Sequence, residues 1–139
     1  MKARLKWVQD VMWVAESETG HAVVMDGAPE IGGRNLGMRP MEMLLLGMGG
    51  CTAMDVISIL KKSREQVTDC EIQMEAKRAE DHPKVFTAIH VHFIVTGKAL
   101  KEATVKRAID LSAEKYCSAS IMLGKTASIT HDYEIREES

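Results

Sequence analysis

The longest apolar stretch of the chain, residues 40–62, reads PMEMLLLGMGGCTAMDVISILKK and constrains the fold more than any other segment. Proline is favourable at the first position of a helix, where its missing N–H has no intrahelical partner. Glu42 suits the positive end of the helix dipole, and Lys61 and Lys62 suit the negative end. The stretch therefore predicts a helix over about 41–62.

The interior of this predicted helix contains Gly47, Gly49 and Gly50, which stand just before Cys51. Each glycine costs about 0.5–1 kcal/mol relative to alanine in a helix interior. A helix accepts such residues most readily where another backbone or a substrate must come close. The Cys51 thiol beside them is therefore a candidate for chemistry.

Apolar residues occupy nearly every side of the same segment, which is typical of a helix that is buried all round. A single sheet of about five strands can cover only one side of such a helix. We therefore expect a second copy of the chain to cover the rest, in a homodimer.

Hydrophobic spacing elsewhere predicts strands around this helix and two further helices after it. Glycine and proline punctuate residues 26–39 as a long loop, and a loop of this length is often functional. The order β-β-α-β-β-α-α-β indicates a single α+β domain over 1–139 with a mostly antiparallel sheet. We expect strands at 4–15 (with a bulge or bend at Gln9-Asp10), 21–26, 68–77, 85–96 and 127–135, and helices within 100–115 and 116–125.

The charge of the chain gives no reason to expect a polyanionic partner. Its net charge is −2, so we expect neither nucleic acid nor an anionic membrane surface. Residues 1–5 lack the basic and then apolar organisation of a signal peptide. Glu42, Asp55 and the glycines argue against the apolar stretch being a membrane span. We therefore expect a cytoplasmic protein.

Three cysteines, Cys51, Cys70 and Cys117, are widely spaced. An odd number does not suggest a secreted disulfide framework, and no CxxC or Cys/His cluster suggests zinc. We therefore expect no metal site. Cys51 and Cys117 both lie in helical, small-residue surroundings, so they form a candidate redox pair. Considered alone, each is more often a small buried hydrophobe.

A reactive thiol needs a positive partner or a helix dipole that favours the thiolate. A carboxylate alone would raise the thiol pKa, so an arginine or lysine should complete the site. Asp55, four residues after Cys51, is given no catalytic role, and Glu114 is interpreted as a surface acid.

Three other residues are candidates for a site but have simpler interpretations. Cys70 alternates with polar residues along its predicted strand, which indicates a core position. His90 and His92 share one strand face, as an H-x-H metal pair would. Because no carboxylate has a matching register in the sequence, we interpret this face as a solvated sheet surface.

The sequence PMEMLLLGMGGC, followed far downstream by AEKYCSASIML, resembles the OsmC/Ohr family of osmotically inducible and organic hydroperoxide resistance proteins. It is most similar to the YhfA-type branch of OsmC-like proteins. The resemblance runs from end to end. Its most specific part is Pro-x-Glu nine residues before the central-helix cysteine, together with a second cysteine that opens a late helix. The resemblance implies an intertwined homodimer in which sheets wrap central helices.

The resemblance also implies roles for individual residues. Cys51 matches the peroxidatic cysteine, Cys117 the resolving cysteine, and Glu42 the glutamate that holds an activating arginine. That arginine lies in the loop before the central helix, where this chain offers Arg34 and Arg39. We favour Arg34, because Arg39 directly precedes Pro40 and suits a solvent-facing position at the helix entry.

The leading hypothesis is a thiol-dependent peroxidase that reduces organic hydroperoxides, with hydrogen peroxide as a second candidate substrate and an external dithiol as reductant. The rival hypothesis is a non-catalytic protein with the same fold that binds a small ligand in an apolar groove. Inert thiols and a ligand retained in native mass spectrometry would favour the rival. Convergence of the Cys51 and Cys117 sulfurs in one pocket would favour the enzyme.

Overall fold

The computed structural model describes all residues, 1–139, as a mixed α+β fold. Its contacts divide into two compact units, 1–44 and 45–139, and each is described by itself. The predicted α+β class and the mainly antiparallel pairing are confirmed, because only β5 and β6 run parallel. The predicted single sheet of about five strands is wrong, since the strands form two separate three-stranded sheets.

The N-terminal unit is built on an antiparallel sheet whose strands follow chain order: β1 (Ala3–Gln9), β2 (Met12–Ser17) and β3 (Ala22–Met25). The segment 4–15, predicted as one strand, is therefore a hairpin. Asp10 stands at the turn with a φ of 54°, in the left-handed region that aspartate tolerates better than most residues. The predicted bend at Gln9-Asp10 is in fact this reversal of the chain.

The loop 26–39 contains a short 3₁₀ turn, Pro29–Ile31, and is organised by a buried carboxylate. Asp26 accepts backbone N–H bonds from Gly27 (2.7 Å), Arg34 (3.1 Å) and Leu36 (3.1 Å). The bond from Leu36 lowers the pKa of Asp26 most, and the other two bonds lower it further. Burial acts in the opposite direction and raises the pKa, but the net shift is downward. A charged Asp26 therefore fixes the path of the chain toward the first helix.

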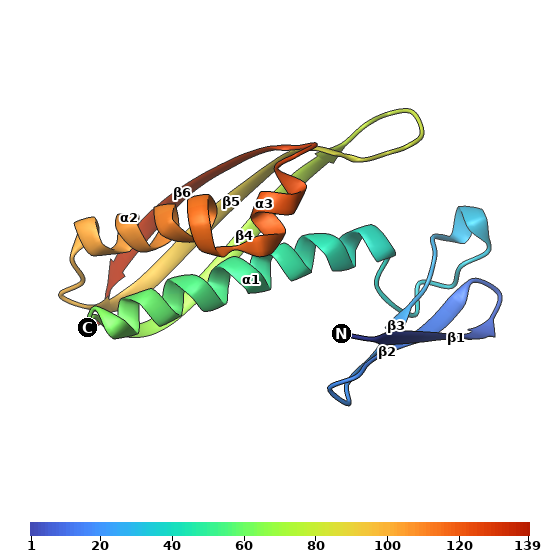
Figure 1. Cartoon of the computed structure of the whole chain (residues 1–139), viewed down its shortest axis with the longest axis horizontal. Coiled ribbons are helices and arrows are strands. Elements are labelled where there is room, and N and C mark those ends of the chain that lie inside the picture. The colour runs from blue at the N-terminus through green and yellow to red at the C-terminus, as the bar shows by residue number, and fades with distance from the viewer. The chain divides into compact units, whose positions relative to one another are not determined.

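The first helix, α1 (Pro40–Lys62), begins in the N-terminal unit and continues into the C-terminal unit. The second sheet has the order β4-β5-β6, with β4–β5 antiparallel and β5–β6 parallel. Figure 1 shows the helices of the C-terminal unit gathered on one face of this sheet. Its strands are β4 (Gln66–Arg78), β5 (Phe86–Lys98) and β6 (Ser128–Glu137), and its helices are α2 (Glu102–Leu111), the π-helix η2 (Ser112–Tyr116) and α3 (Ser118–Leu123).

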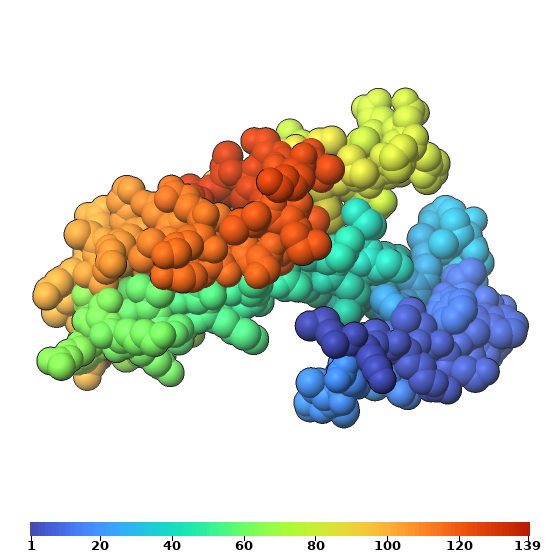
Figure 2. Space-filling model, in the orientation of Figure 1, coloured from blue at the N-terminus to red at the C-terminus, as the bar shows by residue number.

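The core of the C-terminal unit lies between β5 and the helices. Every second side chain of β5 over 89–95 is buried, as the alternating pattern predicted. In Figure 2, the orange α2 segment lies directly against the green part of α1. The buried side chains that meet there include Met48, Val56, Leu60, Ile89, Val91, Phe93, Val95, Val105 and Ile109.

Burial of α1 is confined to one stripe, formed by Met48, Gly49, Thr52, Val56 and Leu60. Outside this stripe, Leu46 is 56% exposed and Met54 is 76% exposed. The chain by itself therefore covers one side of a helix whose sequence is apolar on nearly all sides. By length and composition alone α1 could also span a membrane, a test that core helices of soluble proteins pass as well.

Candidate functional site

Two cysteines and one carboxylate converge in the C-terminal unit. The sulfur atoms of Cys51 and Cys117 and a carboxylate oxygen of Asp55 all lie within 4.8 Å of one another. We call these three residues the thiol–carboxylate cluster. Cys51 and Asp55 share a face of α1 because they are one helical turn apart. Cys117 reaches them from the junction between η2 and α3.

Cys117 is fully buried and caps the N-terminus of α3. Its sulfur accepts hydrogen bonds from the backbone N–H of Ser120 (3.3 Å) and from the Ser120 hydroxyl (3.0 Å). Burial raises the pKa of the Cys117 thiol and neighbouring Cys51 adds to the rise, while the Ser120 bonds oppose it. Cys117 is thus a protonated thiol at neutral pH, with its sulfur held in place.

Asp55 is positioned by a short chain of hydroxyl groups. The Ser112 hydroxyl donates to Asp55 Oδ2 over 3.0 Å, and Ser112 Oγ lies 2.8 Å from Thr52 Oγ1. Because the single Ser112 proton goes to the carboxylate, Thr52 donates to Ser112. Thr52 and Ser112 are both buried. Removing the Ser112 hydroxyl would therefore take a hydrogen-bond partner from both Thr52 and Asp55, whereas removing the Thr52 hydroxyl would leave the Ser112–Asp55 bond in place.

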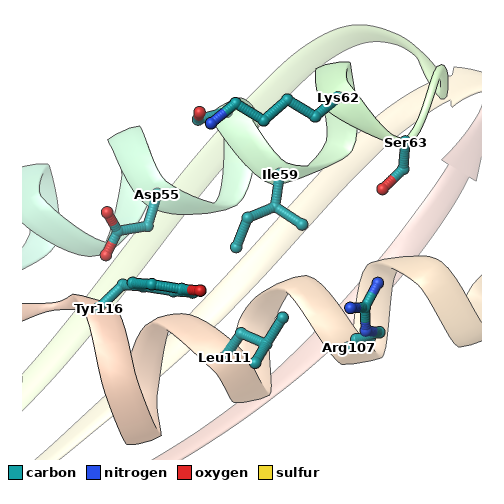
Figure 3. Close-up of a pocket in the computed structure, with 8 residues that line it drawn as sticks. Asp55, Ile59, Lys62, Ser63, Arg107, Leu111 and Tyr116 are labelled. Carbon is teal, nitrogen blue, oxygen red and sulfur yellow. The ribbon is translucent and has the colours of Figure 1, made fainter.

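An open pocket of about 400 Å³ adjoins the cluster through Asp55. Figure 3 shows Asp55 and Tyr116 at one part of the pocket and Lys62, Ser63 and Arg107 at another. Ile59 and Leu111 contribute apolar surface between them. The pocket can therefore hold a molecule with an apolar body, and its two cations favour a negative group.

Cys51 itself is half-buried and stands near the middle of α1. The field of a helix dipole acts mainly within the first and last turns, so α1 does not activate this thiol. No lysine, arginine or histidine of the C-terminal unit forms an ion pair with Asp55. The Asp55 carboxylate therefore has no charged partner within this unit.

The other predicted site residues lie in the N-terminal unit, where each has local partners. Glu42 Oε1 accepts the backbone N–H of Arg39 over 2.8 Å and so caps α1. Arg34 Nε lies 3.6 Å from Asp10 Oδ2, in an exposed ion pair. Arg39 donates to the side chain of Asn35 (2.8 Å) and to the carbonyl of Gly37 (3.3 Å). The catalytic roles of Glu42 and Arg34 remain predictions.

The three remaining candidates, Cys70, His90 and His92, differ from expectation. Cys70 lies on the more buried face of β4, but it is only half-buried and so does not take the predicted core position. Burial raises the pKa of its thiol, with a contribution from Asp69. The interpretation that His90 and His92 lack matching carboxylates is wrong. His92 lies 2.6 Å from Asp132 Oδ1 and 3.2 Å from Glu134 Oε1, and His90 lies 3.0 Å from Asp132.

Sequence reasoning did not identify Ser112, Ser120, Lys62 or Arg107, nor a role for Asp55. The one signal present was the four-residue spacing of Cys51 and Asp55, which places both on one helix face. The other residues reach the site through packing between distant segments. No local pattern in the sequence marks them.

Comparisons with known proteins agree with the fold. A family model described as OsmC-like protein matches residues 32–132. Protein YhfA of Escherichia coli K12 is 51% identical over 97% of this chain and 98% of its own length. The crystal structure of an OsmC-like protein from Mycoplasma pneumoniae is 16% identical and superposes with a TM-score of 0.82 over 97% of this chain and 96% of that one. The organic hydroperoxide resistance protein OhrB of Bacillus subtilis is 17% identical, with a TM-score of 0.64 over 96% of both chains.

Proposed function

The chain belongs to the OsmC-like protein family, and from that premise we propose that it is a thiol-dependent peroxidase that reduces organic hydroperoxides. The observation that carries the proposal is the convergence of the Cys51 and Cys117 sulfurs in one cluster. A relative in fold is named as an organic hydroperoxide resistance protein, which supports a role in defence against oxidative stress.

In the first step, the Cys51 thiolate attacks one oxygen of the peroxide and the O–O bond breaks. The leaving alkoxide takes up a proton and becomes an alcohol. Cys51 loses two electrons and becomes a sulfenic acid, while the peroxide is reduced by two electrons. The half-buried position of Cys51 gives a small peroxide access to the sulfur.

In the second step, the Cys117 thiol condenses with the Cys51 sulfenic acid. A sulfur–sulfur bond forms, and the thiol proton leaves with the hydroxyl group as water. The raised pKa of Cys117 suits this role, because a protonated thiol does not compete with Cys51 for the peroxide. An external dithiol then restores both thiols by exchange and is itself oxidised to a disulfide.

The pocket beside Asp55 supports an organic rather than a purely inorganic substrate. Its apolar side chains, Ile59 and Leu111, suit the carbon body of a hydroperoxide. No metal or organic cofactor takes part in these steps. The same pocket is equally compatible with the rival hypothesis of a small-ligand-binding protein. In that case the thiols would be inert.

The exposed apolar residues of α1 support the further proposal of a homodimer. Leu46 and Met54 are both exposed in a single chain, and contiguous exposed apolar side chains commonly mark interaction surfaces. In this proposal Arg34 supplies the positive charge that holds Cys51 as thiolate. Its ion pair with Asp10 is exposed and therefore weak, so exchanging that partner costs little free energy.

The test is a peroxide-consumption assay with a dithiol reductant, using cumene hydroperoxide and hydrogen peroxide. We expect turnover of peroxide by the wild type and none by Cys51→Ser. Cys117→Ser should consume at most one equivalent of peroxide. It consumes more only if the dithiol reduces the Cys51 sulfenic acid directly. Cys70→Ser serves as the matched control and should retain turnover. Unchanged activity in Cys51→Ser would contradict the proposal.

A further inference from the structure

The thiol–carboxylate cluster has the composition of a metal site as well as that of a redox centre. Thiolates and a carboxylate are the ligands that zinc and similar thiophilic cations take in proteins. We propose that Cys51, Asp55 and Cys117 of the reduced protein bind one thiophilic divalent cation of the zinc class. The proposal shares the residues of the redox centre but does not require peroxide turnover.

The geometry is close to what such a cation needs. In a tetrahedral site with Zn–S of about 2.3 Å and Zn–O of about 2.0 Å, the ligand atoms lie roughly 3.5–3.8 Å apart. The three ligand atoms already lie within 4.8 Å of one another, so small side-chain rotations complete the set. Two of the ligands come from a single turn of α1, which keeps their separation fixed.

Hydrogen bonds hold the ligands in orientations suited to the cation. Ser112 binds only Asp55 Oδ2, which leaves Asp55 Oδ1 free to bind a metal. Ser120 fixes the Cys117 sulfur from the side of α3. Asp55 also lines the open pocket, so a cation can enter there and a water molecule can take the fourth position.

Charge balance favours the same conclusion. No side chain of the C-terminal unit forms an ion pair with Asp55, so this carboxylate has no charged partner. A divalent cation at the centre of the cluster would balance the carboxylate together with the thiolates that form when the cation binds. Each thiol gives up its proton to solvent as its sulfur bonds to the metal. Formation of the Cys51–Cys117 disulfide would remove both sulfur ligands, which makes binding dependent on the redox state.

The test is titration of the reduced full-length chain with Cd²⁺, whose bonds to thiolates absorb in the ultraviolet, and with Zn²⁺ as a competitor. We expect one Cd²⁺ per chain with thiolate absorption, and displacement by Zn²⁺. Asp55→Asn should weaken binding by at least about tenfold, since it removes a charged ligand. Diamide, which oxidises thiols to disulfides, should abolish binding.

The controls separate this site from other thiols and from surface histidines. Cys51→Ser and Cys117→Ala each remove one of the two sulfur ligands, so each should lose at least half of the thiolate absorption and bind Cd²⁺ more weakly. Alanine avoids a polar substitution at the fully buried position of Cys117. Cys70→Ser and His92→Gln should bind as the wild type does. Absence of thiolate absorption in the wild type, or undiminished absorption in Cys51→Ser, would overturn the inference. Peroxide turnover without cadmium binding would contradict the metal site alone, and binding without turnover would contradict the peroxidase alone.

Discussion

The sulfur atoms of Cys51 and Cys117 lie within 4.8 Å of each other, although one belongs to the middle of α1 and the other caps α3. The π-helix η2 between α2 and α3 sets this approach, because it ends at Tyr116 and lets Cys117 take an extended conformation with φ −78° and ψ 98°. π-turns of this kind occur often at functional sites. The chemistry that we propose depends on this contact.

Arg34 and Arg39 can be distinguished by matched substitutions. If Arg34 provides the charge that stabilises the Cys51 thiolate, Arg34→Gln should slow oxidation of Cys51 at pH 7 by about tenfold or more, since an opposite charge nearby lowers a thiol pKa by one unit or more. The rate should recover as the pH is raised. Stopped-flow oxidation by cumene hydroperoxide measures it. Arg39→Gln is the control, and an equal loss in both variants would contradict the assignment.

Glu42 caps α1, and substitution can separate this role from the proposed role of holding the activating arginine. Glu42→Ala removes the side-chain acceptor for the Arg39 N–H and should destabilise the chain by about 0.5–1 kcal/mol. Glu42→Gln keeps an acceptor and should retain most of that stability. If Glu42 also holds the activating arginine, Glu42→Gln should still oxidise slowly. Urea unfolding and peroxide oxidation of the same variants give the two readings, and wild-type oxidation in Glu42→Gln would leave only the capping role.

Alanine substitution of the glycines in α1 tests the proposed homodimer. A methyl group added at Gly49 would meet the Met74 sulfur at 2.7 Å, so a side chain there requires Met74 on β4 to move. At Gly47 and Gly50, nothing outside the adjacent residues and the backbone of α1 lies within 4 Å of the added methyl. In a monomer, Gly47→Ala would stabilise the helix by about 0.5–1 kcal/mol.

If a second copy packs closely there, Gly47→Ala should instead lower the melting temperature and increase dissociation of the dimer on dilution. Sedimentation and thermal unfolding at two protein concentrations measure both effects. A gain in stability that does not depend on concentration would argue against the close approach.

The sequence alone predicts the fold class and most of the helices and strands, because the hydrophobic periodicity of each is a local pattern. It predicted α1, β4, β5 and the positions of both cysteines in helical surroundings. It failed where the outcome depends on pairing between distant segments. The period of two continues through the turn within 4–15, so Gln9-Asp10 indicated only a bulge or bend and not a reversal of the chain.

The carboxylates beside His92 were missed for a similar reason. They arise from the parallel pairing of β5 with β6, which sets His92 opposite Asp132. Parallel strands are joined by long crossover connections, so their register cannot be read from neighbouring residues. The Ser112 and Ser120 contacts likewise depend on the π-helix, which no residue pattern marked.

The histidine–carboxylate pairs on β5 and β6 predict a pH dependence of stability. Hydrogen bonds to Asp132 and then Glu134 raise the pKa of His92, and His92 in turn lowers the pKa of Asp132. The His92 contribution is full below its unfolded pKa of about 6.5 and is lost as the pH rises through its higher folded pKa. The Asp132 contribution is full above its unfolded pKa of about 3.9 and is lost as the pH falls through its lower folded pKa.

Both contributions are therefore present together between about pH 4 and pH 6.5. His92→Gln should reduce the difference in stability between about pH 5.5 and pH 8.5, by a small amount because Asp132 is 60% exposed and screened by water. Urea unfolding at the two pH values measures it, with His21→Gln as the control. The same difference in His92→Gln as in the wild type would contradict the interpretation.

Peptide mass mapping of the reduced chain after one equivalent of cumene hydroperoxide tests the central claim most directly. We predict a disulfide that joins the Cys51 and Cys117 peptides, with Cys70 still free, and a sulfenic acid trapped by dimedone at Cys51 in Cys117→Ala. Reduced Cys51 in the presence of excess peroxide, or a disulfide that involves Cys70 instead, would contradict the account.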